Sequence, residues 1–182
     1  MRIIFTRVFT PSAKQAPLRV LLTAILLGSI LVFSACEVES GKPTSQPAGD
    51  TKTLTRAAGE TDFYIDTVNK QVPSAKVPVT VKVDETPQIM VNGWAVDTPG
   101  KSTAGGVVMV IDGTVEVPTT YGAERADVAK FLNNPSYTNS AFVGWINVAT
   151  ITKGQHILSF KVVTADKQHY YEPANKITLA IQ

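Results

Sequence analysis

The stretch VVMVIDGTVEVPTTY, which runs from Val107 to Tyr121, carries the clearest local structural signal in the chain. Two runs rich in β-branched residues flank the dipeptide Asp112-Gly113. This dipeptide suits a two-residue hairpin turn, because the central residues of such a turn need positive φ angles. The stretch therefore predicts an antiparallel hairpin that turns at Asp112-Gly113.

Period-two alternation of apolar residues, typical of half-buried strands, continues on both sides of this hairpin. Further strands are expected in the ranges 62–70, 76–83, 88–97, 140–150, 155–165 and 176–181. Roughly seven or eight short strands without helix–strand alternation favour an antiparallel β-sandwich. The sandwich domain is expected to span residues 62–182, a size that suits one such domain.

Three of these strands predict which side chains share a face. The shared faces are expected to hold Phe63, Ile65 and Thr67; Val77, Val79, Val81 and Val83; and His156, Leu158, Phe160 and Val162. Pro78 has no N–H to donate to a strand ladder, so its strand is expected at or beside a sheet edge.

One short helix, or two turns of 3₁₀ helix, is expected where GAERADVAKFLNNPSY interrupts the alternation. Val128, Phe131 and Leu132 follow one another at helical spacing. Asp127 or Glu124 lies near the start, and Asn133-Asn134-Pro135 ends the segment.

The first 35 residues are typical of a secretory signal peptide. A basic segment without acidic residues precedes the apolar run VLLTAILLGSILVF, from Val20 to Phe33. A helix of about 14 residues is about 21 Å long, which is shorter than the ~30 Å hydrocarbon core of a bilayer. Length and flanks favour a cleaved signal over the alternative, an uncleaved anchor.

The only cysteine, Cys36, follows this run directly. Phe33-Ser34-Ala35-Cys36 resembles the lipobox of bacterial lipoproteins, with Phe33 where leucine is usual. The resemblance implies cleavage between Ala35 and Cys36, and diacylglyceryl and fatty-acyl groups (palmitate) on Cys36. Two or three acyl chains would anchor the protein stably in a membrane.

Residues 36–61 are expected to form the lipidated cysteine and a flexible tether. The segment is rich in Ser, Thr, Gly and Pro and has few large apolar residues, a composition that does not favour folding. Four of the 17 basic residues precede Cys36 and all 15 acidic residues follow it, which leaves 13 basic residues in that part. The exported part is therefore slightly acidic, and a nucleic-acid partner is not expected.

An ordered series of motifs extends from Phe63 to Ile181. It comprises Asn92-Gly93-Trp94-Ala95-Val96-Asp97, Val110-Ile111-Asp112-Gly113, Tyr121-Gly122, Arg125-Ala126-Asp127-Val128, Ser140-Ala141-Phe142 and Gly154-Gln155-His156. The series resembles an immunoglobulin-like module that recurs in bacterial surface and envelope proteins. The resemblance implies a β-sandwich and no reaction, because this fold serves many functions.

The aromatic residues are the candidates for a sugar-binding surface, because indole faces stack on pyranose rings. The alternation favours a core position between the sheets for Trp94 and leaves Trp145 undecided. Tyr170 and Tyr171, near the last turn, could extend a stacking surface, although a half-buried edge pair is favoured.

Other candidate sites are interpreted as structural. Arg125 and Asp127 could bind a ligand carboxylate, but such a pair more often caps a helix and ties it to a neighbouring loop. The chain has two histidines, His156 and His169, and His156 is expected to be a structural residue whose ring nitrogens are hydrogen-bonded. A metal site is not expected, because a third ligand at suitable spacing is missing. Neither a nucleophile elbow nor a phosphate-binding loop is found.

The sequence therefore predicts an exported, lipid-anchored, non-catalytic β-sandwich protein with an interaction or envelope-structural role and no cofactor. The alternative is a carbohydrate-binding module that contacts envelope or extracellular glycan through Trp145, Tyr170, Tyr171 and Arg125. Glu37 follows Cys36 in place of the aspartate that commonly retains lipoproteins in the inner membrane. We therefore expect the outer membrane, on its periplasmic or surface face, with an envelope protein or glycan as partner.

Overall fold

Strands dominate the part of the chain that the computed structural model describes, residues 46–47 and 51–182. The strands are β1 (Gln46–Pro47), β2 (Thr55–Arg56), β3 (Phe63–Val68), β4 (Val79–Val81), β5 (Gln88–Asp97), β6 (Ser102–Thr103), β7 (Gly106–Ile111), β8 (Val115–Ala123), β9 (Ala141–Asn147), β10 (Gly154–Val163), β11 (His169–Tyr171) and β12 (Ile177–Ile181). The helices are α1 (Ala126–Phe131) and the 3₁₀ helices η1 (Pro135–Tyr137) and η2 (Val148–Thr150). The signal peptide 1–35 and Cys36 lie outside the described residues and stay predictions.

The hairpin expected around Asp112-Gly113 is confirmed. β7 and β8 pair antiparallel, and Asp112 and Gly113 have φ angles of 50° and 72°. The Thr114 N–H donates to the Ile111 carbonyl oxygen over 3.1 Å and closes the turn. Local sequence therefore sets the connection between these two strands.

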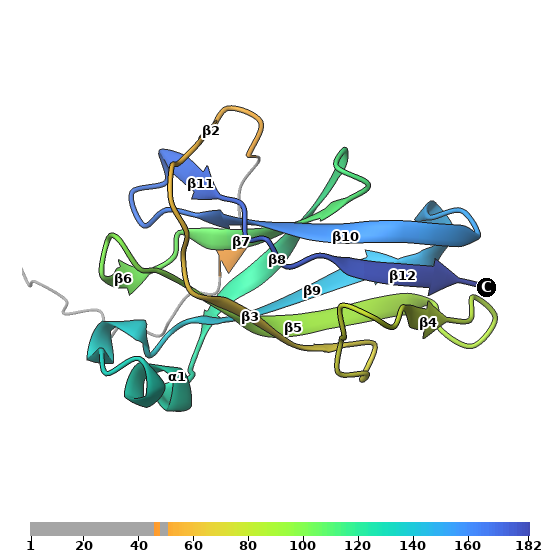
Figure 1. The fold of residues 1–182 in the computed structure, drawn as a ribbon, viewed down its shortest axis with the longest axis horizontal. Helices are drawn as coiled ribbons and strands as arrows, with labels where there is room; N and C mark the ends of the chain where they lie inside the picture. The colour runs from red at the N-terminus through yellow and green to blue at the C-terminus, as the bar shows by residue number, and fades with distance from the viewer. Residues whose placement is uncertain (1–45, 48–50) are drawn as a thin grey trace, which may run out of the picture. The chain divides into compact units, whose positions relative to one another are not determined.

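β8 joins the two sheets of a sandwich (Figure 1). Its first half pairs with β7 and its second half, from Thr119 to Ala123, pairs with β9. One sheet has the order β3-β5-β9-β8, and the other has β4-β12-β10-β7-β8. These orders match the A-B-E-D and G-F-C orders of immunoglobulin domains. The expected all-β, immunoglobulin-like sandwich with one short helix is confirmed.

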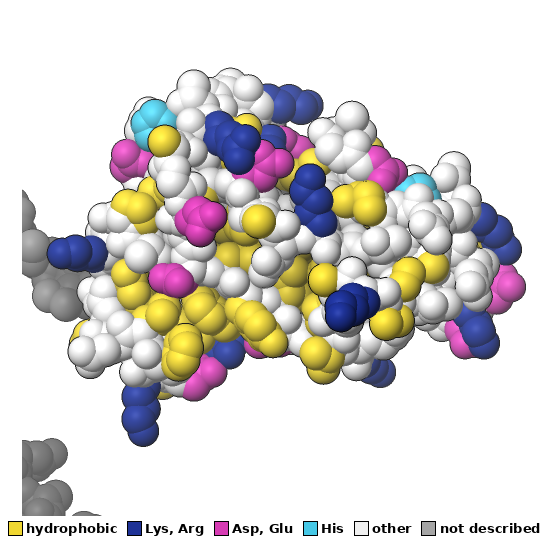
Figure 2. All heavy atoms as spheres, in the orientation of Figure 1, with side chains coloured by type: hydrophobic (Ala, Val, Ile, Leu, Met, Phe, Trp, Pro, Cys, Tyr) yellow, Lys and Arg dark blue, Asp and Glu magenta, His cyan; other side chains and the backbone are white. Residues whose placement is uncertain are grey.

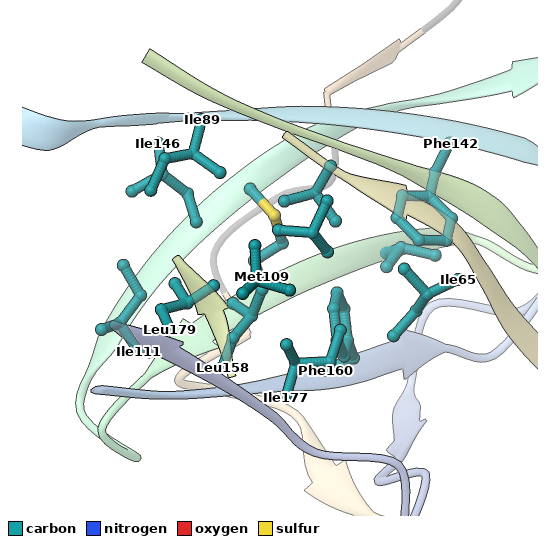
Figure 3. Close-up of a cluster of buried hydrophobic side chains, with 14 of the residues drawn as sticks. Ile65, Ile89, Met109, Ile111, Phe142, Ile146, Leu158, Phe160, Ile177 and Leu179 are labelled. Carbon is teal, nitrogen blue, oxygen red and sulfur yellow. The ribbon is translucent and has the colours of Figure 1, made fainter. Parts of the chain in front are cut away.

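The main core lies between the two sheets. Figure 3 shows Ile89 and Ile146 pointing from one sheet toward Met109, Leu158 and Leu179 of the other. Phe63, Phe142 and Phe160 also meet there, with ring centroids 4.9–6.1 Å apart. Each large apolar side chain buried in this way contributes about 1.5–3 kcal/mol, and the described domain holds together without a disulfide.

Two details of strand pairing differ from the expectation. A β-bulge at Asp66 shifts the register between Ile65 and Thr67, so Thr67 leaves the core face and Val68 is buried in its place. The sandwich is also not wholly antiparallel, because β4 pairs parallel with β12 and β2 pairs parallel with β11. β4 has no second strand partner and lies at an edge, as Pro78 indicated, and Val77 before it is exposed.

The segment expected to be a flexible tether as far as residue 61 packs on the domain from Thr51 onward. Thr51 is 1% exposed, and its hydroxyl donates to the Glu116 carboxylate over 2.6 Å. Lys161 pairs with the same carboxylate at 2.6 Å. β2 then adds to β11, and β1 pairs with β8. Backbone pairing and one buried threonine order this segment although it has few large apolar residues.

A second, smaller apolar cluster lies under α1. It consists of Val96, Val128 and Tyr137, with Trp94 and Leu132 packed against it. The short helix is confirmed, but Phe131, which shares its spacing with Val128, is 78% exposed. A helix of six residues presents little more than one side chain to the sheet, so Phe131 lies beyond that contact. In residues 46–47 and 51–182 no helix is long and apolar enough to cross a membrane.

Candidate functional site

The structure places Trp145 on the outer face of β9, where 51% of the residue is exposed. Its neighbours along the strand, Gly144 and Ile146, are buried, so the indole belongs to the solvent side of the sheet. Directly opposite on β5 lies Met90, which is half-buried. The sequence left open whether Trp145 is a core or a surface residue, and the structure shows that it is a surface residue.

Trp94 is also on this outer face, and the expectation that it lies between the sheets is wrong. Ile89, Val91 and Ala95 of β5 face the core, which leaves Trp94 on the opposite side of the strand. There its ring stacks on Tyr64 of β3, with centroids 6.4 Å apart and planes 25° from parallel.

Tyr64 is a functional candidate that sequence reasoning missed. It is 51% exposed and lies directly opposite Trp94 in the β3–β5 register. The signal was present in the alternation, because Tyr64 separates the inward-facing residues Phe63 and Ile65 and must therefore face outward.

Polar and apolar side chains lie between the two aromatic positions. Asn92 lies two residues from both Met90 and Trp94, and its side-chain oxygen accepts a hydrogen bond from the Thr67 hydroxyl. Val143 of β9 is opposite Asn92. We call the outer face formed by Tyr64, Met90, Asn92, Trp94, Val143 and Trp145 the aromatic face. Along β5 its two ends are four residues apart, or about 13 Å at 3.3 Å per residue.

Tyr170 and Tyr171 do not belong to the aromatic face. Tyr171 is 6% exposed, and its hydroxyl donates to the buried Asp97 carboxylate over 3.2 Å. Burial and the nearby Asp97 charge raise the pKa of Tyr171. Tyr170 is half-buried on the other sheet, with the Lys161 ammonium 4.6 Å from its ring centroid. The favoured expectation of a half-buried pair holds for Tyr170, whereas Tyr171 is buried, and the alternative of a stacking surface at this pair is wrong for Tyr171.

Arg125 has structural partners on both sides. Its guanidinium binds both oxygens of Asp127 at 2.8 Å and one oxygen of Asp66 at 2.7 Å. These hydrogen bonds, the one to Asp127 first, raise the pKa of Arg125 and lower that of Asp127 to about 2. The expected cap is not formed, since no side chain caps α1. Arg125 does link the helix to a neighbouring segment as expected, but that segment is strand β3 and not a loop. Arg125 is thus occupied by two carboxylates.

The expectation of a structural role for His156 is confirmed by its contacts. Nδ1 lies 2.7 Å from the Asp112 carboxylate and Nε2 lies 2.9 Å from the Thr152 carbonyl oxygen. Chiefly through the Asp112 hydrogen bond, the pKa of His156 is raised. His169 Nδ1 lies 2.7 Å from the Thr55 hydroxyl, which holds β2 against β11. Within the described ranges, no three His, Cys, Asp or Glu residues are grouped so as to hold a metal ion.

A hollow opens beside Tyr64 at the edge of the sandwich, where β3 faces the segment that leads into β12. Its volume is about 400 Å³, and a smaller hollow of about 130 Å³ adjoins its residues Ala174 and Asn175. Figure 2 shows hydrophobic side chains gathered over β3 on this side of the molecule. This hollow could not be predicted from the sequence, because its two walls come from segments about 100 residues apart.

The fold and the aromatic face together define an immunoglobulin-like β-sandwich with a candidate binding surface on one sheet. No family model matches the chain, and no curated protein matches it. Among solved structures, the chain is similar to AggA, the major subunit of aggregative adherence fimbriae type I from Escherichia coli. The match has 11% identity and a TM-score of 0.29, and covers 70% of this chain and 99% of that chain. A TM-score this low transfers nothing about function.

Proposed function

We propose that the chain is an exported, lipid-anchored protein whose β-sandwich binds an envelope or extracellular glycan on the aromatic face and catalyses no reaction. The half-exposed indole of Trp145, on the same face as the Tyr64–Trp94 stack, is the observation that carries the proposal. Large exposed aromatic rings are costly to leave in water, and their flat faces match the apolar faces of sugar rings.

The middle of the aromatic face supplies what a sugar ring needs besides stacking. The Asn92 amide N–H₂ can donate to a sugar hydroxyl, because the Asn92 side-chain oxygen is already bonded to Thr67. The strand backbone fixes all these side chains, so the surface is formed before a ligand arrives. A preformed surface loses less entropy on binding than a mobile one.

The contacts of the titratable groups agree with a binding role without catalysis. Arg125, Asp66 and Asp127 satisfy one another, and His156 has both ring nitrogens engaged. Neither group lies on the aromatic face next to Trp145. A general acid or base would need a free proton-transfer group within reach of the ligand.

Attachment to the outer membrane through Cys36 is part of the proposal. It is supported by the lipobox-like sequence at Phe33-Ser34-Ala35-Cys36 and by Glu37. At most 14 residues lie between Cys36 and the packed segment that begins at Thr51, and they span no more than about 50 Å. The domain would therefore act close to the membrane that carries it.

A second candidate is an envelope-structural role in which the aromatic face contacts another protein. Met90 and Val143, half-buried between the aromatic positions, favour it, because Met and aromatic residues are enriched at protein interfaces.

The test is binding of the full-length lipoprotein, in detergent micelles, to an array of soluble oligosaccharides. Trp145→Ala should abolish binding to the glycans that the wild type retains while leaving the melting temperature unchanged. Phe131→Ala is the matched control, since Phe131 is an exposed aromatic residue outside the aromatic face. Loss of glycan binding in both variants alike, or no retained glycan at all, would reject the glycan role; capture of an envelope protein that depends on Trp145 would then support the second candidate.

A further inference from the structure

The hollow beside Tyr64 has the size and lining of a ligand pocket. Its volume of about 400 Å³ lies within the usual range for small-molecule sites. Tyr64, Pro73 and Ile177 supply apolar surface, while Ser74, Asn175 and Lys176 supply polar groups. All the polar groups come from two exposed segments, so a ligand could enter directly from solvent.

The two segments that supply the polar groups of the pocket carry lysines. The segment 69–77 carries Lys70 and Lys76 and no carboxylate, and the segment 173–177 carries Lys176 and no carboxylate. All three lysines are exposed, and no ion pair in residues 51–182 involves Lys176. Of the three lysines, Lys176 lines the pocket, and it therefore offers a positive charge that no ion pair of the described residues neutralises.

The nearest carboxylates are already engaged or lie outside this pocket. Asp66, two residues from Tyr64, is paired with Arg125. Glu172 lines the smaller adjoining hollow and pairs with Arg56 at 3.5 Å. Glu60 lines that smaller hollow as well. No carboxylate lines the pocket itself, and Lys176 is the charged residue among its lining residues.

Tyr64 connects the pocket to the aromatic face. Its ring stacks on Trp94, and Tyr64 is also one of the residues that line the pocket. A chain of sugar rings that lies across β5 toward β3 would therefore reach the pocket at its end. This continuity favours a glycan over a separate small molecule as the occupant.

We propose that the pocket binds a carboxylate-bearing sugar residue, a uronic acid, within the glycan that the aromatic face holds. The sugar ring would lie against Tyr64, and its carboxylate would face the Lys176 ammonium. Ser74 and Asn175 line the same pocket and offer polar groups to the sugar. The inference rests on the proposed function and names its ligand class: an acidic polysaccharide in preference to a neutral one.

The experiment compares neutral hexasaccharides with the hexasaccharides of the corresponding uronates. The pairs are mannose and mannuronate, galactose and galacturonate, and glucose and glucuronate. The full-length lipoprotein in detergent micelles is titrated by calorimetry at low and at high NaCl. At least one uronate hexamer should bind more tightly than its neutral counterpart, and Lys176→Gln should weaken that binding about fivefold without affecting the neutral hexamer. Added salt should remove most of the difference, because it screens exposed charges.

Lys153→Gln is the matched control, because Lys153 is an exposed lysine in the turn before β10, remote from the pocket lining. A uronate preference that Lys176→Gln leaves intact, or that Lys153→Gln removes equally, would overturn the pocket assignment. Equal affinity for both members of every pair would overturn the acidic ligand class while leaving glycan binding in place. Binding of an acidic peptide in place of all the sugars would reject both this inference and the proposed glycan function.

Discussion

The Arg125 guanidinium lies 2.7 Å from the Asp66 carboxylate and so ties the residue before α1 to the bulge of β3. The two residues are 59 positions apart in the sequence, and both side chains are less than one third exposed. Because the bulge makes Asp66 an extra residue in its strand, its side chain is directed to a partner outside the strand ladder. The ion pair thus links the helical segment to the edge of the sheet that carries the aromatic face.

Loss of this ion pair should destabilise the domain. Arg125→Gln is expected to lower the free energy of unfolding by about 2 kcal/mol, because it removes charge-assisted hydrogen bonds that are partly shielded from water. Asp66→Asn should cost a similar amount, and the double variant should cost less than the sum, as measured by urea unfolding. Asp127→Asn, on the exposed side of Arg125, should cost less than either; additive losses for Arg125 and Asp66 would contradict the pairing.

Gly93 should tolerate no side chain. A Cβ at this position would lie 2.1 Å from the Tyr64 carbonyl oxygen and 3.0 Å from the Ile65 Cα, both backbone atoms of the paired strand. Gly93→Ala is therefore expected to lose about 3 kcal/mol or more in thermal or urea unfolding, at the upper end of overpacking costs. Gly144→Ala is the comparison, because its Cβ would first meet the flexible end of Met109. A larger loss at Gly144 than at Gly93 would show that the β3–β5 approach is looser than described.

The His156–Asp112 pair should make stability depend on pH. The pKa of His156 is raised, chiefly by its hydrogen bond to Asp112, so its contribution is fully present below the ordinary histidine value of 6.5 and is lost as pH rises through the raised value. The pKa of Asp112 is lowered, chiefly by His156, so its contribution is lost only as pH falls through that lowered value.

Urea unfolding between pH 4.5 and pH 9 measures this dependence. His156→Gln should flatten the decline above pH 6.5, whereas His169→Gln should leave it in place. Retention of the full decline in the His156 variant would assign it to other groups.

The two tryptophans should differ in their effect on stability. Trp94→Ala should cost about 1–3 kcal/mol, because the indole packs on Tyr64 and on the cluster under α1. Trp145→Ala should change the free energy of unfolding by no more than about 0.5 kcal/mol, as expected of an exposed position. Urea denaturation curves separate the two, and iodide should quench the indole of Trp145 more than that of Trp94. Equal losses in the two variants would contradict their different burial.

Lipidation should depend on Cys36. Metabolic labelling with a palmitate analogue is expected to label the wild type and not Cys36→Ser, because this is the only cysteine in the chain and its sulfur would carry the diacylglyceryl group. Ser45→Ala, in the same segment, should label as the wild type does. Equal label in the wild type and in Cys36→Ser would end the lipoprotein proposal.

Local sequence determined most of the strands and the connection between β7 and β8. The Asp112-Gly113 turn forms where it was expected, since few dipeptides accept two positive φ angles. The number and spacing of alternating segments favoured the sandwich class, because many one-sided strands without intervening helices bury their apolar faces when two sheets pack together. The short strands β1, β2, β6 and β11 escaped prediction, since two or three residues carry no period.

Only the tertiary structure decided which face of β5 meets the core. Both faces of β5 carry apolar residues. The face that contains Gly93 lies inward, because a glycine without a side chain lets β3 and Phe142 approach the strand closely. Trp94 is directed to the surface by that choice. The packing of Thr51 on Glu116, the Arg125–Asp66 pair and the pocket beside Tyr64 likewise join distant segments. Where both faces of a strand carry apolar residues, a period-two pattern defines the two faces, but only the neighbours that fold against the strand determine which face is buried.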